Sequence, residues 1–279
     1  MGRKTLIDWA DASWNPVTGC RHGGTYCYAR RIATRFCSNE HGKDDAGVAF
    51  PCSGDCKFCS ELDGLEFLDQ VTRVNHSPSE TYPFGFLPTI HPHRLDVPSK
   101  WKKPKTIFVC SMADLFGAWV RDEWIEKVVN ACLAAPQHRY LFLTKNPDRY
   151  LDMDKKGLLP REFWYGYSAT KQDQLWTFKH ADDCLCTKLF VSIEPLLEPM
   201  QPGFCTHTPA DWVIIGAETG NRKGKVVPKK DWVMEIAEEC EYSGIPVFMK
   251  ESLRDLMGDD FRQEFPWKEE EAWKSKSSE

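Results

Sequence analysis

The chain has 279 residues, with 36 lysines and arginines against 41 aspartates and glutamates, and a formal net charge of −5 at pH 7. This length accommodates one large domain or two small ones, and nothing in the sequence resembles a basic nucleic-acid-binding tail, so any contact with phosphate would come from a local patch. The N-terminal segment lacks the apolar run of a signal peptide, and no window holds the roughly 18 apolar residues of a membrane span. We therefore expect a soluble, cytoplasmic protein that is not bound to a membrane.

The first candidate site along the chain is the loop "TGCRHGGTYCYARR", residues 18–31. Cys20 and Cys27 lie seven positions apart, and Gly24 stands where a C-x3-C-x2-C motif would carry its middle cysteine. Three thiolates at that spacing hold three irons of a cubane cluster and leave the fourth iron open. The loop therefore contains two thirds of a motif of this kind. The third ligand could be His22 or a thiol from elsewhere in the chain, or the cluster could have moved to another motif.

The next segment, residues 37–80, is a polar insertion rich in Gly and Ser that follows the first predicted helix. It contains four cysteines, Cys37, Cys52, Cys56 and Cys59. Because the segment cannot bury a core of its own, it would need a metal to fold. Three alternatives stay open: a structural zinc held by all four thiolates, a cubane held by Cys52, Cys56 and Cys59, or unligated thiols. Cys37 lies ten residues past Cys27, about 15 Å along a helix, which favours a site separate from the loop.

The run "SKWKKPK" places four lysines around Trp101: Lys100, Lys102, Lys103 and Lys105. Lysines beside an aromatic ring suit single-stranded nucleic acid, where base stacking and charge act together. The other interpretation is a solvated entrance to the following strand. A nucleic-acid partner is therefore one possibility that the sequence raises.

After about residue 104 the chain alternates apolar β-branched or aromatic runs with amphipathic segments, the α/β pattern of parallel sheets. Helical spacing of apolar residues predicts two crossover helices, within "DEWIEKVVNACLAA" and "DWVMEIAEECEYSG". The predicted strands are 106–110, 140–144, 163–168, 188–194, 211–218 and 245–250. With a further strand before Cys20, this predicts one domain over residues 1–279, an α/β fold that forms a complete or partial βα (TIM-like) barrel.

Polar side chains stand where the predicted strands end, and in such barrels the strand ends form the open mouth that carries function. They are Cys20, Ser111, Asp114, Thr144, Lys145, Ser168, Thr170, Ser192, Glu194, Glu218 and Lys250. The loop "GAETGNRKGK", residues 216–225, follows one of these ends and contains Arg222; it is either a cradle for phosphate or carboxylate or a basic surface loop.

The six remaining cysteines form no metal motif. Cys110, Cys132 and Cys240 fall on apolar strand or helix faces and are expected in the core. Cys184 and Cys186 form a C-x-C pair without partners, and Cys205 stands alone in the sequence.

Several stretches together resemble a phage-associated family of radical S-adenosylmethionine-like proteins of largely unknown function (DUF5131-like). They are "DASWNPVTGC", "CYARRIATRF", "FGFLPTIHPHRLDVPSKWKKPKTIFVCSMADLFG", "FLTKNPDRY", "FVSIEPLLEP", "DWVIIGAETGNRKGKVVPK" and "VFMKESL". The resemblance implies a 4Fe-4S cluster after the first strand, bound S-adenosylmethionine, and its reductive cleavage to a 5′-deoxyadenosyl radical. Cys20 matches the first cluster ligand and Cys27 the last, whereas Gly24 departs from the family pattern.

With this resemblance, the mouth residues receive expected roles. Catalytic roles are assigned to Glu218, Glu194 and Lys145, and cofactor binding to Ser111, Asp114, Thr144, Ser192 and Arg222. A radical enzyme of this kind would take electrons from a reductase or a flavodoxin-type donor. The alternative is a catalytically degenerate barrel with a zinc-stapled insertion that binds a nucleotide or a protein partner, and Gly24 is the residue that divides the two hypotheses.

Overall fold

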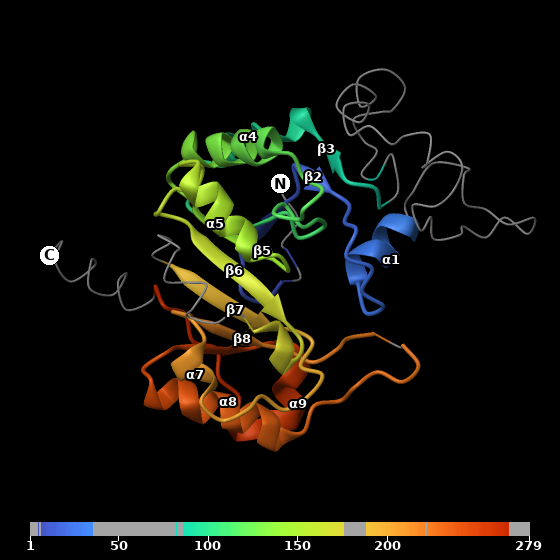
Figure 1. The fold of residues 1–279 in the computed structure, drawn as a ribbon, viewed down its shortest axis with the longest axis vertical. Coiled ribbons are helices and arrows are strands. Elements are labelled where there is room, and N and C mark those ends of the chain that lie inside the picture. Colours follow the sequence, from blue (N-terminus) through green and yellow to red (C-terminus); the bar gives the residue numbers. More distant parts are fainter. Residues whose placement is uncertain are drawn as a thin grey trace, which may run out of the picture. The chain divides into compact units, whose positions relative to one another are not determined.

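The computed structural model describes residues 5, 7–35, 82, 86–175, 188–220 and 222–267. It divides into two compact units, each described below by itself. Figure 1 labels helices and strands of the chain. Unit 1 comprises Met1–Thr5 and Ala10–Arg149, and unit 2 comprises Leu6–Trp9 and Tyr150–Glu279. Cys37, Cys52, Cys56 and Cys59 lie outside the described residues, so the metal site expected in the insertion stays a prediction.

Unit 1 is built on three parallel strands in the order β1-β4-β5. These are β1 (Ala12–Trp14), β4 (Thr106–Val109) and β5 (Arg139–Thr144), and Ala12 lies opposite Ile107 while Ile107 lies opposite Tyr140. Every residue of β4 is buried, as expected for a parallel strand that is covered on both faces. A short antiparallel pair, β2 (Val17–Thr18) and β3 (Thr89–Ile90), extends from the end of β1.

Two helices of unit 1 follow from their sequences. Helix α1 (Tyr28–Arg35) begins directly after Cys27, and helix α4 (Asp122–Leu133) buries Trp124, Ile125, Val128, Val129 and Cys132. The buried positions of α4 recur at intervals of three and four residues, so they form one stripe that packs on the sheet. Two short 3-10 helices, η1 (Pro92–Arg94) and η2 (Pro98–Lys100), lead into β4.

Unit 2 contains four parallel strands in the order β6-β7-β8-β9: β6 (Trp164–Ala169), β7 (Leu189–Ile193), β8 (Val213–Ile215) and β9 (Val247–Met249). Figure 1 shows α7 (Phe204–His207), α8 (Lys230–Tyr242) and α9 (Arg254–Met257) on one side of these strands. The remaining elements are α5 (Asp148–Lys155), which begins at the end of unit 1, and the 3-10 helices η3 (Gln172–Gln174), η4 (Glu251–Leu253) and η5 (Gly258–Asp260).

Close packing in unit 2 depends on a glycine in β6. A Cβ at Gly166 would lie 2.2 Å from the ring of Phe190 on the neighbouring strand, far inside van der Waals contact. Trp212, which is fully buried, contacts the rings of Trp9, Phe190 and Trp267 within the same core. Gly166 therefore lets an aromatic ring lie across the strand.

Strand order follows chain order within each unit, and every pairing in these two sets is parallel. A doubly wound sheet reverses its order at a switch point, whereas a βα barrel adds each new strand on the same side. The expected parallel α/β class is confirmed, and within each unit the strands are added in chain order, as they are in a βα barrel. Closure into a complete barrel and the single-domain boundary of 1–279 stay predictions.

All six strands expected after residue 104 are present, although the one expected over 211–218 shortens to Val213–Ile215. Both expected crossover helices are present as α4 and α8. Among the helices of the described residues, none is long and apolar enough to cross a bilayer.

Candidate functional site

The loop after β1 is fixed by a close backbone contact at Gly19. Gly19 has a φ of +86°, and a Cβ at this position would lie 2.1 Å from the carbonyl oxygen of Leu87. The next residue, Cys20, donates its backbone N–H to the carbonyl of Phe86 at 3.1 Å. Because only glycine fits this approach, the contact sets where the Cys20 thiol lies.

The two loop cysteines lie against the same small apolar cluster. Both are half-buried and pack on a group formed by Ala29, Ala33, Tyr82, Phe86 and Met112. Backbone N–H groups point at both sulfurs: His22 donates to Cys20 Sγ at 3.5 Å, and Arg30 donates to Cys27 Sγ at 3.4 Å. The structure therefore places the two predicted metal ligands against one apolar cluster, and metal binding by them stays a prediction.

Burial raises the pKa of the Cys20 thiol to about 11, and the charges of Asp114 and Cys27 raise it further against the opposing effect of the His22 N–H. Without a metal, Cys20 is therefore protonated at neutral pH. A thiophilic cation would have to displace this proton, so metal binding at Cys20 releases a proton to solvent.

Asp114 is the centre of a buried hydrogen-bond network beside these thiols. Its Oδ1 accepts from Thr144 Oγ1 at 2.7 Å and from the Phe116 N–H at 3.1 Å. Its Oδ2 accepts from the Lys145 N–H at 2.9 Å and contacts His22 Nε2 at 2.6 Å. Since an ionised carboxylate only accepts, we assign the proton of the imidazole to Nε2. The network thus links the end of β5 to the cysteine loop.

Lys145 reaches from the end of β5 to the place of the absent third cysteine. Its Nζ donates to Tyr26 Oη at 2.9 Å and lies 4.7 Å from the centre of the Tyr26 ring. A Cβ at Gly24 would lie 3.9 Å from Lys145 Nζ and 3.6 Å from Tyr26 Cζ. A side chain at position 24 would therefore meet an ammonium group and a phenol without a clash.

Three further residues of this region, for which the sequence predicted no role, contact the site: Asn15, Trp119 and Tyr26. Asn15 Oδ1 accepts hydrogen bonds from Ser111 Oγ at 3.2 Å and from the Met112 N–H at 2.9 Å. Trp119 stacks edge-on against the His22 ring, with centroids 4.8 Å apart, and Tyr26 binds Lys145. The Asn-Pro pair after β1 and the aromatic residue before Cys27 were the only local signals. Ser111, expected to bind a cofactor, is held by Asn15.

In unit 2, two residues that were each expected at a strand end form an ion pair. Glu194, after β7, forms an ion pair with Lys250, after β9, through Oε1 and Nζ. Gly216, after β8, lies beneath this pair, because a Cβ there would lie 2.9 Å from Lys250 Cδ. Ser192 is buried within β7. The glycine therefore permits the acid and the base to meet across the end of β8.

The loop after β8 is closed by a second ion pair. Arg222 donates from Nε and Nη2 to the two oxygens of Glu218, at 2.5 and 2.7 Å. The hydrogen bond from Arg222 lowers the pKa of Glu218, whose side chain is 3% exposed. Glu218 is thus an ionised, paired carboxylate. Arg222, expected to bind an anion, already binds this one.

Two lysines of the "SKWKKPK" run, Lys100 and Lys105, contact other side chains. Lys100 pairs with Asp96 at 2.6 Å, and Lys105 Nζ lies 5.8 Å from the Trp101 ring centre. Trp101 also packs edge-on against His138. Nothing in this arrangement tests nucleic-acid binding, which stays a prediction.

Within the described part of the chain, no three His, Cys, Asp or Glu side chains are placed to bind one metal ion. In that part of the chain, Cys20 and Cys27 are therefore not members of a ready-made three-ligand group.

The fold and the loop define a parallel α/β protein with two thiols at the end of its first strand. A family model described as a protein of unknown function (DUF5131) matches residues 4–254, so the chain belongs to this family. The chain is similar in structure to spore photoproduct lyase complexed with dinucleoside spore photoproduct, with a TM-score of 0.46, 12% identity, and coverage of 89% of this chain and 81% of that one. A cysteine-to-serine mutant of spore photoproduct lyase gives a TM-score of 0.40 with the same identity and coverage. No curated protein matches the sequence.

Proposed function

We propose that this protein is a radical enzyme that uses an iron-sulfur cluster and S-adenosylmethionine, with the cluster held at Cys20 and Cys27. The observation that carries the proposal is the placement of these two thiols on one apolar cluster at a strand end, beside the Asp114 network. Cluster loops need soft ligands in partly buried, water-poor surroundings, and this loop supplies them.

The described residues fit two of the three thiolate positions of a cubane and do not fit the third. Gly24 offers no ligand, and Lys145 Nζ lies beside the space that a side chain would take. His22 is one source of a further donor, because a carboxylate that holds Nε2–H leaves the lone pair of Nδ1 for a metal. The other source is the cysteine-rich insertion. We therefore derive no reaction step through the cluster.

The polar residues around the loop have clear binding chemistry. Lys145, held by Tyr26 Oη, presents an ammonium group that suits the carboxylate of S-adenosylmethionine, and Asp114 fixes the backbone from which Lys145 projects. Thr144, through its hydroxyl, keeps Asp114 in place. In this scheme Lys145 binds ligand, and Asp114 and Thr144 are positioning residues.

In unit 2 we assign the Glu194–Lys250 and Glu218–Arg222 pairs to ligand binding. Each pair lies at the carboxyl end of a strand, and each joins a donor with an acceptor. A protonated amine of a ligand can take the place of the cation in either pair and leave the carboxylate paired with a positive charge. Leaving Glu218 unpaired would be costly, because its side chain is buried, whereas Glu194 is partly exposed.

Anaerobic purification and reconstitution with iron and sulfide test the proposal. We expect iron and sulfide to bind, and 5′-deoxyadenosine to form when S-adenosylmethionine and dithionite are added. The Cys20→Ser/Cys27→Ser double variant should lose both, whereas Cys184→Ser, a thiol removal outside the described residues, should lose neither. Retention of iron by the double variant would place the cluster elsewhere. Zinc without iron, and no 5′-deoxyadenosine, would favour the degenerate, non-redox alternative.

The same reconstitution identifies the third ligand. If His22 completes the site, His22→Ala lowers the iron content and Cys56→Ser does not. If the insertion completes it, the order reverses. If both variants still bind the full amount of iron, neither His22 nor Cys56 is a ligand. Cys20 and Cys27 then hold the cluster without a third ligand from these residues, and the loop is not incomplete.

A further inference from the structure

Unit 2 contains a second pair of thiols that comes from positions far apart in the chain. Cys205 lies in α7 and Cys240 lies in α8, and their sulfur atoms are 3.3 Å apart. A disulfide bond is about 2.05 Å long, so closing it requires a movement of roughly 1.3 Å. In the sequence, Cys205 has no other cysteine near it, and Cys240 is predicted on the buried face of a helix. The tertiary structure makes them neighbours.

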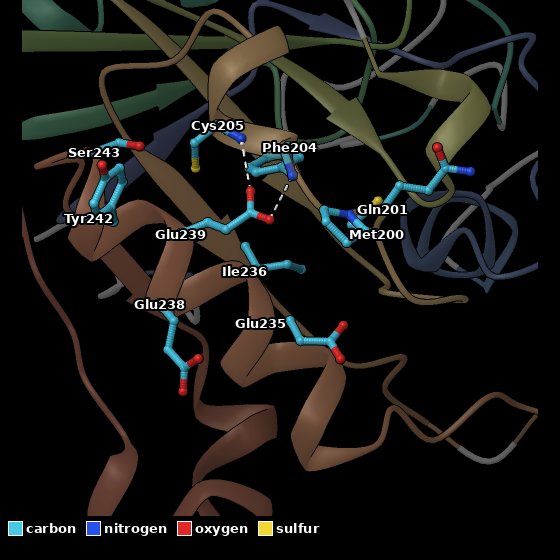
Figure 2. A pocket seen from close by; sticks show the side chains of 12 residues that line it. Met200, Gln201, Phe204, Cys205, Glu235, Ile236, Glu238, Glu239, Tyr242 and Ser243 are labelled. Carbon is cyan, nitrogen blue, oxygen red and sulfur yellow. Dashed lines mark hydrogen bonds between the residues drawn. The ribbon is translucent and has the colours of Figure 1, made fainter.

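The two thiols differ in their access to solvent. Cys205 is 8% exposed and lines a cavity of about 490 Å³ between α7, α8 and the segment before α7 (Figure 2). Cys240 is fully buried and is not among the residues that line this cavity. A small reagent that enters the cavity therefore meets Cys205 first. Cys240 is placed to react only with a sulfur that is already bound at Cys205.

The contact between the helices is held by Glu239. Its carboxylate accepts from the Gly203 N–H at 2.8 Å and from the Cys205 N–H at 3.3 Å, as Figure 2 shows. These bonds fasten the start of α7 to α8 one residue before Cys240. The two sulfurs are therefore kept in register by a neighbouring contact that does not involve them.

The surroundings make Cys205 the more acidic thiol. Its hydrogen bond with Cys240, together with one to Ser243, holds the pKa of Cys205 below its ordinary value, against burial and the charge of Glu239. The same contact and burial raise the pKa of Cys240 far above its ordinary value. The thiol that lines the cavity thus has the lower pKa of the two, which is the arrangement of an attacking and a resolving cysteine.

The charge of the cavity selects the reagent. Its lining includes Glu235, Glu238 and Glu239, and no lysine or arginine is among the described residues that line it. In Figure 2 Glu235 and Glu238 extend from α8 beside the cavity. An anionic reagent would be repelled from this wall, whereas a cationic reagent would be attracted.

We propose that Cys205 and Cys240 form a thiol-disulfide exchange site for small cationic or neutral disulfides. The Cys205 thiolate attacks one sulfur of the small disulfide, forms a mixed disulfide and releases one small thiol. Cys240 then gives up its proton and attacks the Cys205 sulfur, which expels the second small thiol. The protein gains one disulfide between α7 and α8, and the reagent is reduced to two thiols. This inference rests on unit 2 alone and does not depend on a metal or on S-adenosylmethionine.

The test uses the reduced full-length chain and three probes: cystamine, which is cationic, 2-hydroxyethyl disulfide, which is neutral, and oxidised glutathione, which is anionic. Peptide mapping by mass spectrometry should find a Cys205–Cys240 cross-link that is absent before treatment. The rate should fall in the order given, with about threefold or more between the first and the last probe at low ionic strength, and the difference should shrink with added salt. Cys132, fully buried in α4, is the internal control and should stay reduced.

Variants establish the order of attack. Cys240→Ser should trap the mixed disulfide on Cys205, whereas Cys205→Ser should leave Cys240 unmodified. Glu238→Gln removes one charge of the wall without touching the Glu239 hydrogen bonds, and should narrow the gap between cystamine and oxidised glutathione. The proposal is overturned if no Cys205–Cys240 cross-link forms, if Cys132 reacts as fast, or if oxidised glutathione reacts fastest.

Discussion

Restoring a cysteine at position 24 is the most direct test of why the loop is incomplete. Gly24 has no left-handed φ, and its added Cβ would have nearest neighbours at 3.6, 3.7 and 3.9 Å, all ordinary contact distances. Gly24→Cys should therefore fold normally. Replacing a glycine at a compatible position stabilises a protein by about 0.4–1 kcal/mol through the unfolded chain, so the metal-free variant should melt at the same temperature or slightly higher.

The introduced thiol would complete C-x3-C-x2-C with Cys20 and Cys27. We expect iron affinity to rise by at least about tenfold, which corresponds to about 1.4 kcal/mol. Any cleavage of S-adenosylmethionine should rise with the iron content. Because Lys145 Nζ would lie close to the new side chain, its charge should lower the pKa of that thiol, whereas burial keeps the pKa of Cys20 near 11. In the metal-free protein, alkylation should therefore be faster at position 24 than at Cys20.

Gly23→Cys is the control for an added thiol, because it places one a residue away, in open space, at a spacing that does not match the motif. Gly23 has a φ of +71°, so this variant should be somewhat less stable, and its melting temperature is measured alongside its iron content. The assay compares iron and sulfide per chain for the three proteins after identical anaerobic reconstitution. Equal iron in the parent chain and in Gly24→Cys would refute the reasoning, since the loop would then need no third thiolate. Equal gains from Gly23→Cys and Gly24→Cys would show that any added thiol suffices.

Three further predictions concern stability. Asp114→Leu should lower the free energy of unfolding by about 1–3 kcal/mol, because the Thr144 hydroxyl and the Lys145 N–H lose their acceptor. Asp114→Asn keeps an acceptor oxygen and should lower the free energy of unfolding by less. Equal urea midpoints for the two variants would contradict this prediction. Burial and the charge of Arg94 lower the pKa of His91 to about 3 in the folded protein. Between this value and pH 6.5, His91 is therefore protonated in the unfolded chain but neutral in the folded one. Stability should therefore fall as pH drops from 6.5 toward 3, by at most about 1.4 kcal/mol per pH unit, and His91→Gln should flatten this profile; parallel profiles would rule out His91 as the cause. Gly166→Ala should destabilise unit 2 by about 1–3 kcal/mol, because its methyl group meets the Phe190 ring, and an unchanged melting temperature would show that the ring moves freely.

The sequence by itself determined the strands of the parallel α/β pattern, the helices α1, α4 and α8, and the incomplete cysteine loop. The apolar stripe of α4 and the buried runs of β4 and β7 are local patterns, because side chains three or four apart on a helix, or adjacent on a buried strand, report their surroundings directly. The spacing of Cys20 and Cys27 likewise needs no structure to be read. For the same reason the absence of a thiol at Gly24 was visible from the start.

Only the tertiary structure decided which side chains meet. His22 and Asp114 are 92 residues apart, and Tyr26 and Lys145 are 119 apart, so no periodicity could pair them. The strand-end rule predicted that Asp114, Thr144 and Lys145 would be near one another, but not that one carboxylate would bind the other two and His22. Cys205 and Cys240 became a pair only because α7 packs on α8. Contacts of this kind depend on how elements pack, which is set by the whole core rather than by any short stretch of sequence.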